Sequence, residues 1–258
     1  APGYVEGAMN QIDGKPLIAV SDEAKALHKT LNIVDLHSDT LMWNRDLNDR
    51  ASRGHMDLPR LQEGNVALQL FSSVTKTPKN QNYDGNGADS DNITLLTVAQ
   101  LQPVKTWSSL AERSLYHAQK RDDAVAASNN AIKAVNTASQ LDALLAARQK
   151  DTRPIGAMLT IEGLQNLEGK AANLDRLYDA GFRMAGLTHF FDNELAGSMH
   201  GLKKGGLTPF GRDIARRMEA KGMIIDIAHL SHTGVAEVLD MATRPVVSSH
   251  GGVQATCK

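Results

Sequence analysis

Histidines and carboxylates stand at the ends of several predicted strands of this 258-residue chain. The segment IVDLHSDTL, residues 33–41, begins as a buried strand would and then runs into His37 and Asp39. A solvated loop could carry such groups at little cost, but burying unpaired ionisable groups is expensive. The two residues are two positions apart, so on a strand their side chains point to the same side. Imidazole nitrogen and carboxylate oxygen are normal Zn²⁺ ligands, which makes this pair a candidate metal site.

The same residue types close other predicted strands. Four of the nine histidines and one glutamate stand at such ends. They are His37, Glu162, His189, His229 and His250, whereas one further strand ends only in Ser72 and Ser73. Taken singly, each has a simpler explanation, because a lone histidine is more often just a satisfied polar residue and Glu162 could begin a helix. Taken together they favour a metal site, since unpaired buried ionisable groups are costly.

These candidates are more than one tetrahedral ion needs. They suit two ions if a carboxylate, for which Glu162 is best placed, bridges them. Two metal ions roughly 3.5–4 Å apart can share a hydroxide and hold the oxygen of a reacting carbonyl, so the residues point to metal-assisted hydrolysis. The remaining histidines fall in predicted helices or loops, where we expect them on the surface or behind the ligands: His28, His55, His117, His200 and His232.

Six short apolar segments must position these residues. The predicted strands are Ile33–His37, Ala157–Glu162, Val246–His250 and the apolar runs after Gly64, Gly181 and Gly222. Helical patterns lie between most of them, which predicts a parallel sheet with right-handed crossovers. In a parallel α/β barrel the carboxyl ends of the strands converge on one face, so the polar residues would meet there.

Glycines mark the turns from helix to strand. Gly64, Gly181 and Gly222 each fall where a helix needs a left-handed residue before the chain enters a strand. The last of these helices has clear start signals as well, with Thr208 as its N-cap and Pro209 at its first position.

We expect one domain over residues 1–258, with a helical insertion at about residues 76–150. That insertion begins with a polar, turn-rich loop and continues as a mostly helical segment. The composition, 41% hydrophobic and 22% charged, is ordinary for a soluble globular protein. The net charge of −1 argues against a nucleic-acid partner. The chain has no apolar stretch of about 20 residues, so no transmembrane helix is expected.

Five ordered motifs resemble those of the membrane (renal) dipeptidase family, the M19 class of zinc peptidases. The motifs are DLHSDTL, MLTIEG, GLTHFFDNELAGS, GGLTPFG with the DIAHLS that follows it, and PVVSSHG. The resemblance runs from about Asn32 to Lys258. It implies a (β/α)8 barrel of the TIM type with a binuclear zinc centre. It also implies cleavage of dipeptides, commonly with a D-residue at the C-terminal position, and in some members the opening of β-lactam rings.

The resemblance also assigns roles to the strand-end residues. The implied ligand sets are His37, Asp39 and Glu162 for one zinc ion, and Glu162, His229 and His250 for the other. Glu162 would bridge the two ions. His189 would contact the oxygen of the scissile carbonyl and stabilise the tetrahedral intermediate.

The sequence departs from the family in its strand count. Six strands are predicted where a closed barrel has eight, and the chain reaches Lys258 before the positions of the family's carboxylate-binding arginine and proton-shuttling aspartate. We therefore expect a barrel truncated to about six strands and a chain that is inactive alone. The missing C-terminal segment would come from a second chain or a partner copy, because open sheet edges invite aggregation. Cys257 would pair with a cysteine of that segment or stay a free buried thiol.

Three functions stay open on this basis. The first is a zinc-dependent dipeptidase, acting on a dipeptide substrate and compatible with a homodimer. The second is an amidohydrolase for another small amide or a β-lactam. The third is a metal-binding scaffold without catalytic activity. His/carboxylate sites accept several divalent ions, so the choice of zinc rests on the resemblance.

Overall fold

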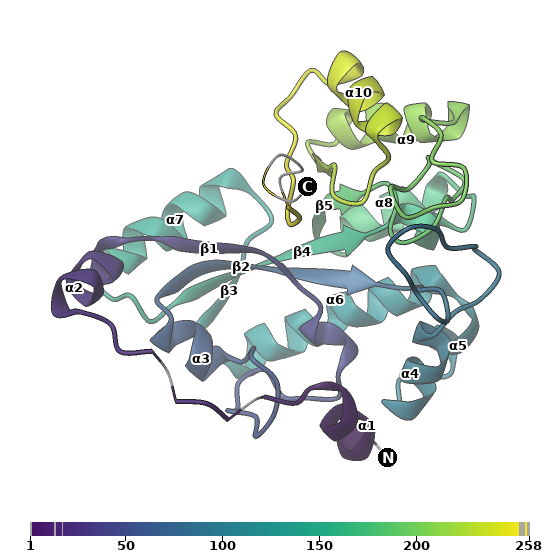
Figure 1. Cartoon of the computed structure of the whole chain (residues 1–258). Coiled ribbons are helices and arrows are strands. Elements are labelled where there is room, and N and C mark those ends of the chain that lie inside the picture. Colours follow the sequence, from purple (N-terminus) through teal and green to yellow (C-terminus); the bar gives the residue numbers. More distant parts are fainter. Residues whose placement is uncertain (1, 13, 17, 253–255, 257–258) are drawn as a thin grey trace.

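One parallel sheet organises the chain, and a computed structural model describes residues 2–12, 14–16, 18–252 and 256 (Figure 1). The strands are β1 (Ile33–Ser38), β2 (Val66–Val74), β3 (Ile132–Ala134), β4 (Ile155–Glu162), β5 (Phe182–Gly186) and β6 (Ile224–Asp226). Their order is β1-β2-β4-β5-β6, and β3 pairs with the first residues of β4. The sheet curls as a half-barrel, so the predicted barrel-type α/β fold with about six strands is confirmed. Cys257 lies outside the described residues.

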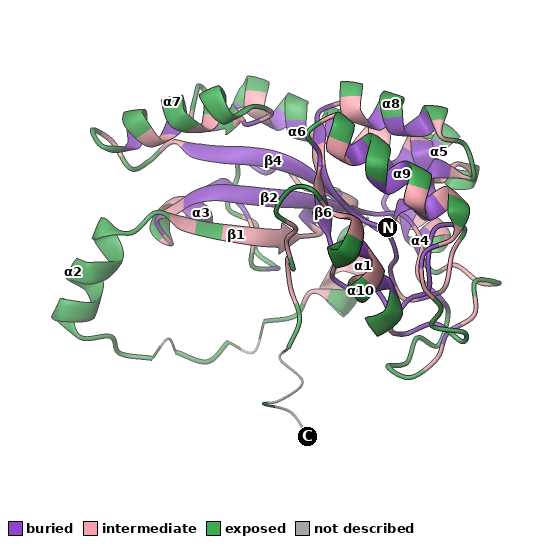
Figure 2. Ribbon diagram, turned by 90° about the horizontal axis from the view of Figure 1, so that it is seen from above, coloured by how far each residue is buried: buried purple, intermediate pink, exposed green. Residues whose placement is uncertain are grey.

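Helices flank this sheet and its connecting loops in the described part of the chain. They are α1 (Pro2–Met9), α2 (Asp22–Thr30), α3 (Leu58–Glu63), α4 (Ile93–Ala99), α5 (Lys105–Ser108), α6 (Leu110–Ala127), α7 (Ala138–Arg148), α8 (Ala172–Asp179), α9 (Pro209–Ala220) and α10 (His232–Met241). Two 3₁₀ turns, η1 (Thr40–Met42) and η2 (Leu164–Leu167), follow β1 and β4. Figure 2 shows α6 to α9 together on one side of β4 and β2, with β1 farther from them. Within the described ranges, no helix is long and apolar enough to cross a membrane.

Two strand predictions were wrong in detail. The segment Val246–His250 is not a strand, because only Val247 forms a bridge, with Asp226 of the three-residue β6. Beyond Val247 the segment stops pairing with β6 through its backbone. The Ser249 amide and hydroxyl donate to the Asp226 side chain instead. Conversely, the mostly helical insertion contains β3, which the sequence did not reveal. Of its three residues only Ile132 is buried, so β3 carries almost no strand pattern.

The glycine predictions were confirmed at two of three sites. Gly181 and Gly222 have φ of +101° and +72°, as the left-handed turn requires. Gly64 has φ −75°, and Asn65 takes the left-handed position with φ +52° instead. Asparagine tolerates this conformation, and the Asn65 amide donates to two backbone carbonyls of the α2 region, at 2.9 and 3.0 Å. Thr208 caps α9 as predicted, accepting a hydrogen bond from the Gly211 amide at 3.0 Å.

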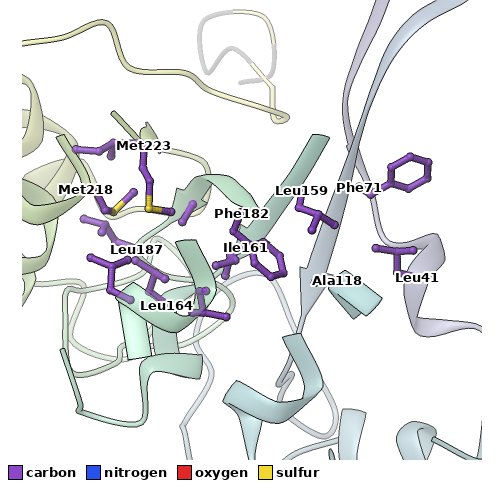
Figure 3. Close-up of a cluster of buried hydrophobic side chains, with 14 of the residues drawn as sticks. Leu41, Phe71, Ala118, Leu159, Ile161, Leu164, Phe182, Leu187, Met218 and Met223 are labelled. Carbon is purple, nitrogen blue, oxygen red and sulfur yellow. The ribbon is translucent and has the colours of Figure 1, made fainter. Parts of the chain in front are cut away.

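The main core lies between the sheet and its covering helices (Figure 3). Leu159 and Ile161 of β4 point into it beside Phe182 of β5. Met158 belongs to a second apolar cluster. Because strand side chains alternate, Glu162 shares the face of Met158, opposite the face of Leu159 and Ile161. The fold thus places a carboxylate on the inner face of the half-barrel, at the carboxyl end of its central strand.

Candidate metal centre

Glu162 lies at the centre of the site formed by residues at and after the strand ends. Its side chain is 7% exposed. Oε1 lies 2.8 Å from Nε2 of His229, 3.2 Å from Nε2 of His250 and 3.4 Å from Nε2 of His189. Oε2 lies 3.5 Å from Nε2 of His37. Four imidazoles from distant parts of the chain therefore gather around one buried carboxylate.

Asp39 joins this group through His37. Its Oδ1 lies 3.2 Å from Nε2 of His37, and this buried oxygen makes no hydrogen bond to any described residue. The rings of His37 and His250 are 4.1 Å apart, and Nε2 of His250 lies 2.8 Å from Nε2 of His229. The structure brings all six predicted strand-end residues together: His37, Asp39, Glu162, His189, His229 and His250.

The donor set fits divalent metal ions. Two groups each place one ligand atom per residue within 4.8 Å of one another: His37, Glu162 and His250, and Glu162, His189 and His229. Imidazole and carboxylate are the donors that zinc takes in proteins. Glu162 belongs to both groups, as a bridging ligand would. These two groups differ from the ligand sets that the family resemblance implies. In the structure His189 is grouped with His229, and His250 with His37, whereas the resemblance groups His229 with His250.

Burial and neighbouring charged groups shift the pKa values of the residues in this site in opposite directions. Burial disfavours the charged form of His37, but Asp39 and Glu162 outweigh it and raise the pKa of His37 to about 10. For His189 burial dominates and lowers the pKa to about 4. Burial also opposes ionisation of Glu162, yet the positive potential of His189 and hydrogen bonds from the other histidines hold its pKa well below the ordinary value. The centre therefore contains an ionised carboxylate at neutral pH.

A buried carboxylate orients His250. Asp226, the last residue of β6, accepts the Ser249 hydroxyl and the backbone amides of Ser249 and Ala228, the amides at 3.1 and 3.0 Å. Since its own proton goes to Asp226, the Ser249 hydroxyl accepts from Nδ1 of His250 at 2.8 Å. The proton on Nδ1 leaves the lone pair of Nε2 facing Glu162 and His229, as a metal ligand requires.

His229 is held by its backbone instead. Its φ is +62°, an uncommon conformation for a non-glycine residue. The carbonyl of His229 accepts the Met199 amide at 2.8 Å and the Thr188 hydroxyl at 3.2 Å. These bonds fix a backbone turn that aims the imidazole at Glu162. Nδ1 of His229 is buried without a partner among the described residues.

One further histidine, His200, lies beside this region. His200 was expected on the surface or behind the ligands, and it is 4% exposed, with its ring centroid 5.3 Å from that of His229. It stacks on Phe190 at 4.5 Å, and Nδ1 donates to the carbonyl of Tyr83 at 2.8 Å. No periodic pattern marks it, because it lies in an irregular loop that folds back over the strand ends. His117 is also buried, whereas the other three are exposed as predicted: His28, His55 and His232.

Residues 21–258 match the family profile described as membrane dipeptidase (peptidase family M19). A dipeptidase of Aspergillus oryzae is 28% identical over 254 residues, covering 90% of this chain and 55% of that protein. An uncharacterised dipeptidase of Schizosaccharomyces pombe is 30% identical over 200 residues, covering 76% of this chain and 43% of that protein. The chain thus spans about half the length of the curated relatives it matches.

Solved structures share the fold. The probable dipeptidase PvdM from Pseudomonas aeruginosa superposes with a TM-score of 0.69 at 17% identity, over 90% of this chain and 55% of that one. A metallo peptidase from Rhodobacter sphaeroides, liganded with a phosphinate mimic of the dipeptide L-Ala-D-Ala, gives a TM-score of 0.61 at 18% identity, over 85% and 65%. At these identities the likeness establishes the architecture, in which the half-barrel corresponds to part of a larger barrel.

Proposed function

Since the chain belongs to the membrane dipeptidase family, peptidase family M19, we propose that the protein hydrolyses the peptide bond of dipeptides with two bound zinc ions. The observation that carries this proposal is the single buried carboxylate, Glu162, shared by four imidazoles. Dipeptidases among the curated relatives support the substrate class. A related fold that binds a mimic of L-Ala-D-Ala supports acceptance of a D-residue at the C-terminal position. The proposal concerns the whole protein, of which this chain spans about half the relatives' length.

Each residue at the centre has a proposed task. The proposed ligands are His37, Asp39, Glu162, His229 and His250, with Glu162 between the two ions. The bound ions would supply Lewis acidity and a nucleophile near neutral pH. His189 is 4% exposed and would contact the carbonyl oxygen of the scissile bond, where negative charge develops. Asp226 and Ser249 would keep His250 in the tautomer that binds metal.

Hydrolysis of Gly-D-Ala and Gly-L-Ala, measured before and after thorough chelation, tests the proposal. Chelation should abolish turnover and added zinc should restore it, with two ions per chain by elemental analysis. Turnover that survives chelation would reject a metal-dependent mechanism. Turnover of a β-lactam or another small amide, with none of either dipeptide, would establish the amidohydrolase alternative instead.

A further inference from the structure

Much of the buried face of α6 is polar, and we propose that this face positions the metal-binding side chains at the ends of β1 and β4 and the nearby His189. This role rests on the metal centre proposed above. A helix packed on a core normally buries an apolar stripe. In α6 the buried residues include Arg113, Ser114, His117 and Arg121, at helical spacing. Figure 1 shows α6 running along the sheet near β2 and β4, and it also contacts η1 and η2, the turns that follow β1 and β4.

Ser114 is the centre of this polar face. Its hydroxyl accepts from the Asn166 amide at 2.8 Å and lies 2.9 Å from the Ser73 hydroxyl. Ser73 Oγ in turn lies 2.8 Å from Nδ1 of His117. These contacts form one chain of hydrogen bonds, in which the Asn166 side-chain amide donates to Ser114, Ser114 contacts Ser73, and Ser73 contacts His117. Asn166 stands four residues after Glu162, so this chain ties the end of β4 to the end of β2.

Lys120 reaches the end of β1. Its ammonium donates to the carbonyl of Leu41 at 2.7 Å and to that of Trp43. Leu41 lies in the turn η1 and Trp43 is its C-cap, and the N-cap of the same turn is Asp39. No carboxylate is paired with this lysine in the described chain, and burial lowers its pKa to about 8. The Lys120 ammonium therefore binds two backbone carbonyls, and these hydrogen bonds hold the turn that begins at Asp39.

Arg113 reaches the chain beyond β2. Its guanidinium donates to the carbonyl of Thr75 and pairs with Asp91 at 2.9 Å. The next carbonyl, that of Lys76, lies 3.4 Å from Nδ1 of His189. Arg113 thus holds the segment that contacts the His189 ring from behind.

A stabilising role alone would not explain so many polar groups on one buried face. Apolar residues of similar volume are often as stable as, or more stable than, a buried polar network. Hydrogen bonds add direction, and they hold each turn at one distance from the helix. Metal sites need that accuracy, because ligands must stay within about 0.5 Å of the productive geometry. Groups that orient ligands typically change metal affinity 10–100-fold when removed.

Cobalt titration of Ser114→Ala tests the role of α6, with Ser128→Ala as the matched control. Ser128, the C-cap residue of α6, is also buried, accepts the Ile132 amide at 3.0 Å and donates to the Val125 carbonyl at 2.8 Å, but it contacts no ligand-bearing turn. Both variants lose a buried hydroxyl, so both should lose comparable stability against urea. Only Ser114→Ala should bind Co²⁺ about 10-fold more weakly and show an altered visible absorption spectrum.

Lys120→Met provides a second, independent variant, because methionine keeps much of the apolar stem while removing the donor to η1. Weaker cobalt binding in Ser114→Ala or Lys120→Met, with Ser128→Ala unchanged, supports the positioning role. Cobalt affinity equal to that of the wild type in all three variants would overturn it. Equal losses of cobalt affinity in Ser114→Ala and Ser128→Ala would overturn it as well. A wild-type chain that binds no cobalt would instead reject the metal centre itself, and the role of α6 with it.

Discussion

The two halves of the proposed metal centre are held by different means. His37, Asp39 and Glu162 stand on or directly after strands of six and eight residues, with α6 behind the turns that follow them. His229 and His250 follow a strand of three residues and a single isolated bridge. In the first half the backbone ladder and a helix set the geometry. In the second, the Asp226 side chain and the hydrogen-bonded backbone turn at His229 replace the missing ladder.

Asp226 shows what that replacement requires. One carboxylate accepts two backbone amides and one hydroxyl, and so fixes both the chain after β6 and the orientation of His250. A ladder spreads the same task over many bonds, and loss of one bond is tolerated. The second half should therefore be more sensitive to a single substitution in its supports than the first.

Glu162→Gln should have the largest effect, because Glu162 is common to both halves. An amide has one oxygen acceptor and no charge, so it cannot serve two cations as a carboxylate does. We expect loss of metal from both positions and turnover near background. Elemental analysis after equilibrium dialysis measures the occupancy. Retention of one full equivalent of metal would show that Glu162 does not bridge.

His189→Ala should separate catalysis from metal binding. If His189 contacts the reacting carbonyl, its loss should lower the turnover number by roughly 10²–10³, as removal of an oxyanion donor typically does. Metal content should stay at the wild-type value, because His189 is outside the proposed ligand sets. Loss of metal equal to that of Glu162→Gln would instead make His189 a ligand, consistent with its proximity to His229.

Asp226→Asn should weaken one half only. The amide can donate as well as accept, so the Ser249 hydroxyl and the His250 tautomer are no longer fixed. We expect metal affinity at one of the two positions to fall 10–100-fold, the usual effect of losing such support. A two-site chelator competition measures both constants. Equal weakening at both positions would contradict the independence of the two halves.

The strand ends could be predicted because burial and alternation leave a clear pattern there. A charged or imidazole side chain that ends an apolar run, as Glu162 and His229 do, is visible in one sequence. The polar face of α6 was not visible, because Arg113 and Lys120 look like solvent-exposed helix residues until their partners are known. Most of those partners are backbone carbonyls, and the pairing of Arg113 with the distant Asp91 is likewise not specified by the sequence. The sequence left the burial of His200 open for a related reason, since its place depends on the path of a loop.

The smallest effect, on the α6 side, is a pH dependence of stability due to His117. Burial, followed by the nearby charges of Lys120 and Arg113, lowers the pKa of His117 to about 3, against 6.5 ordinarily. Between these values the unfolded chain binds a proton that the folded chain does not, so this group's contribution to stability is constant above about pH 7 and falls as the pH is lowered. At pH 5 the loss from this group is about 2 kcal/mol.

His117→Gln has no titrating group, so its unfolding free energy should fall less than that of the wild type between pH 7 and pH 5, in urea titrations at each pH. Parallel losses in the two proteins would mean that His117 takes up a proton equally well when folded.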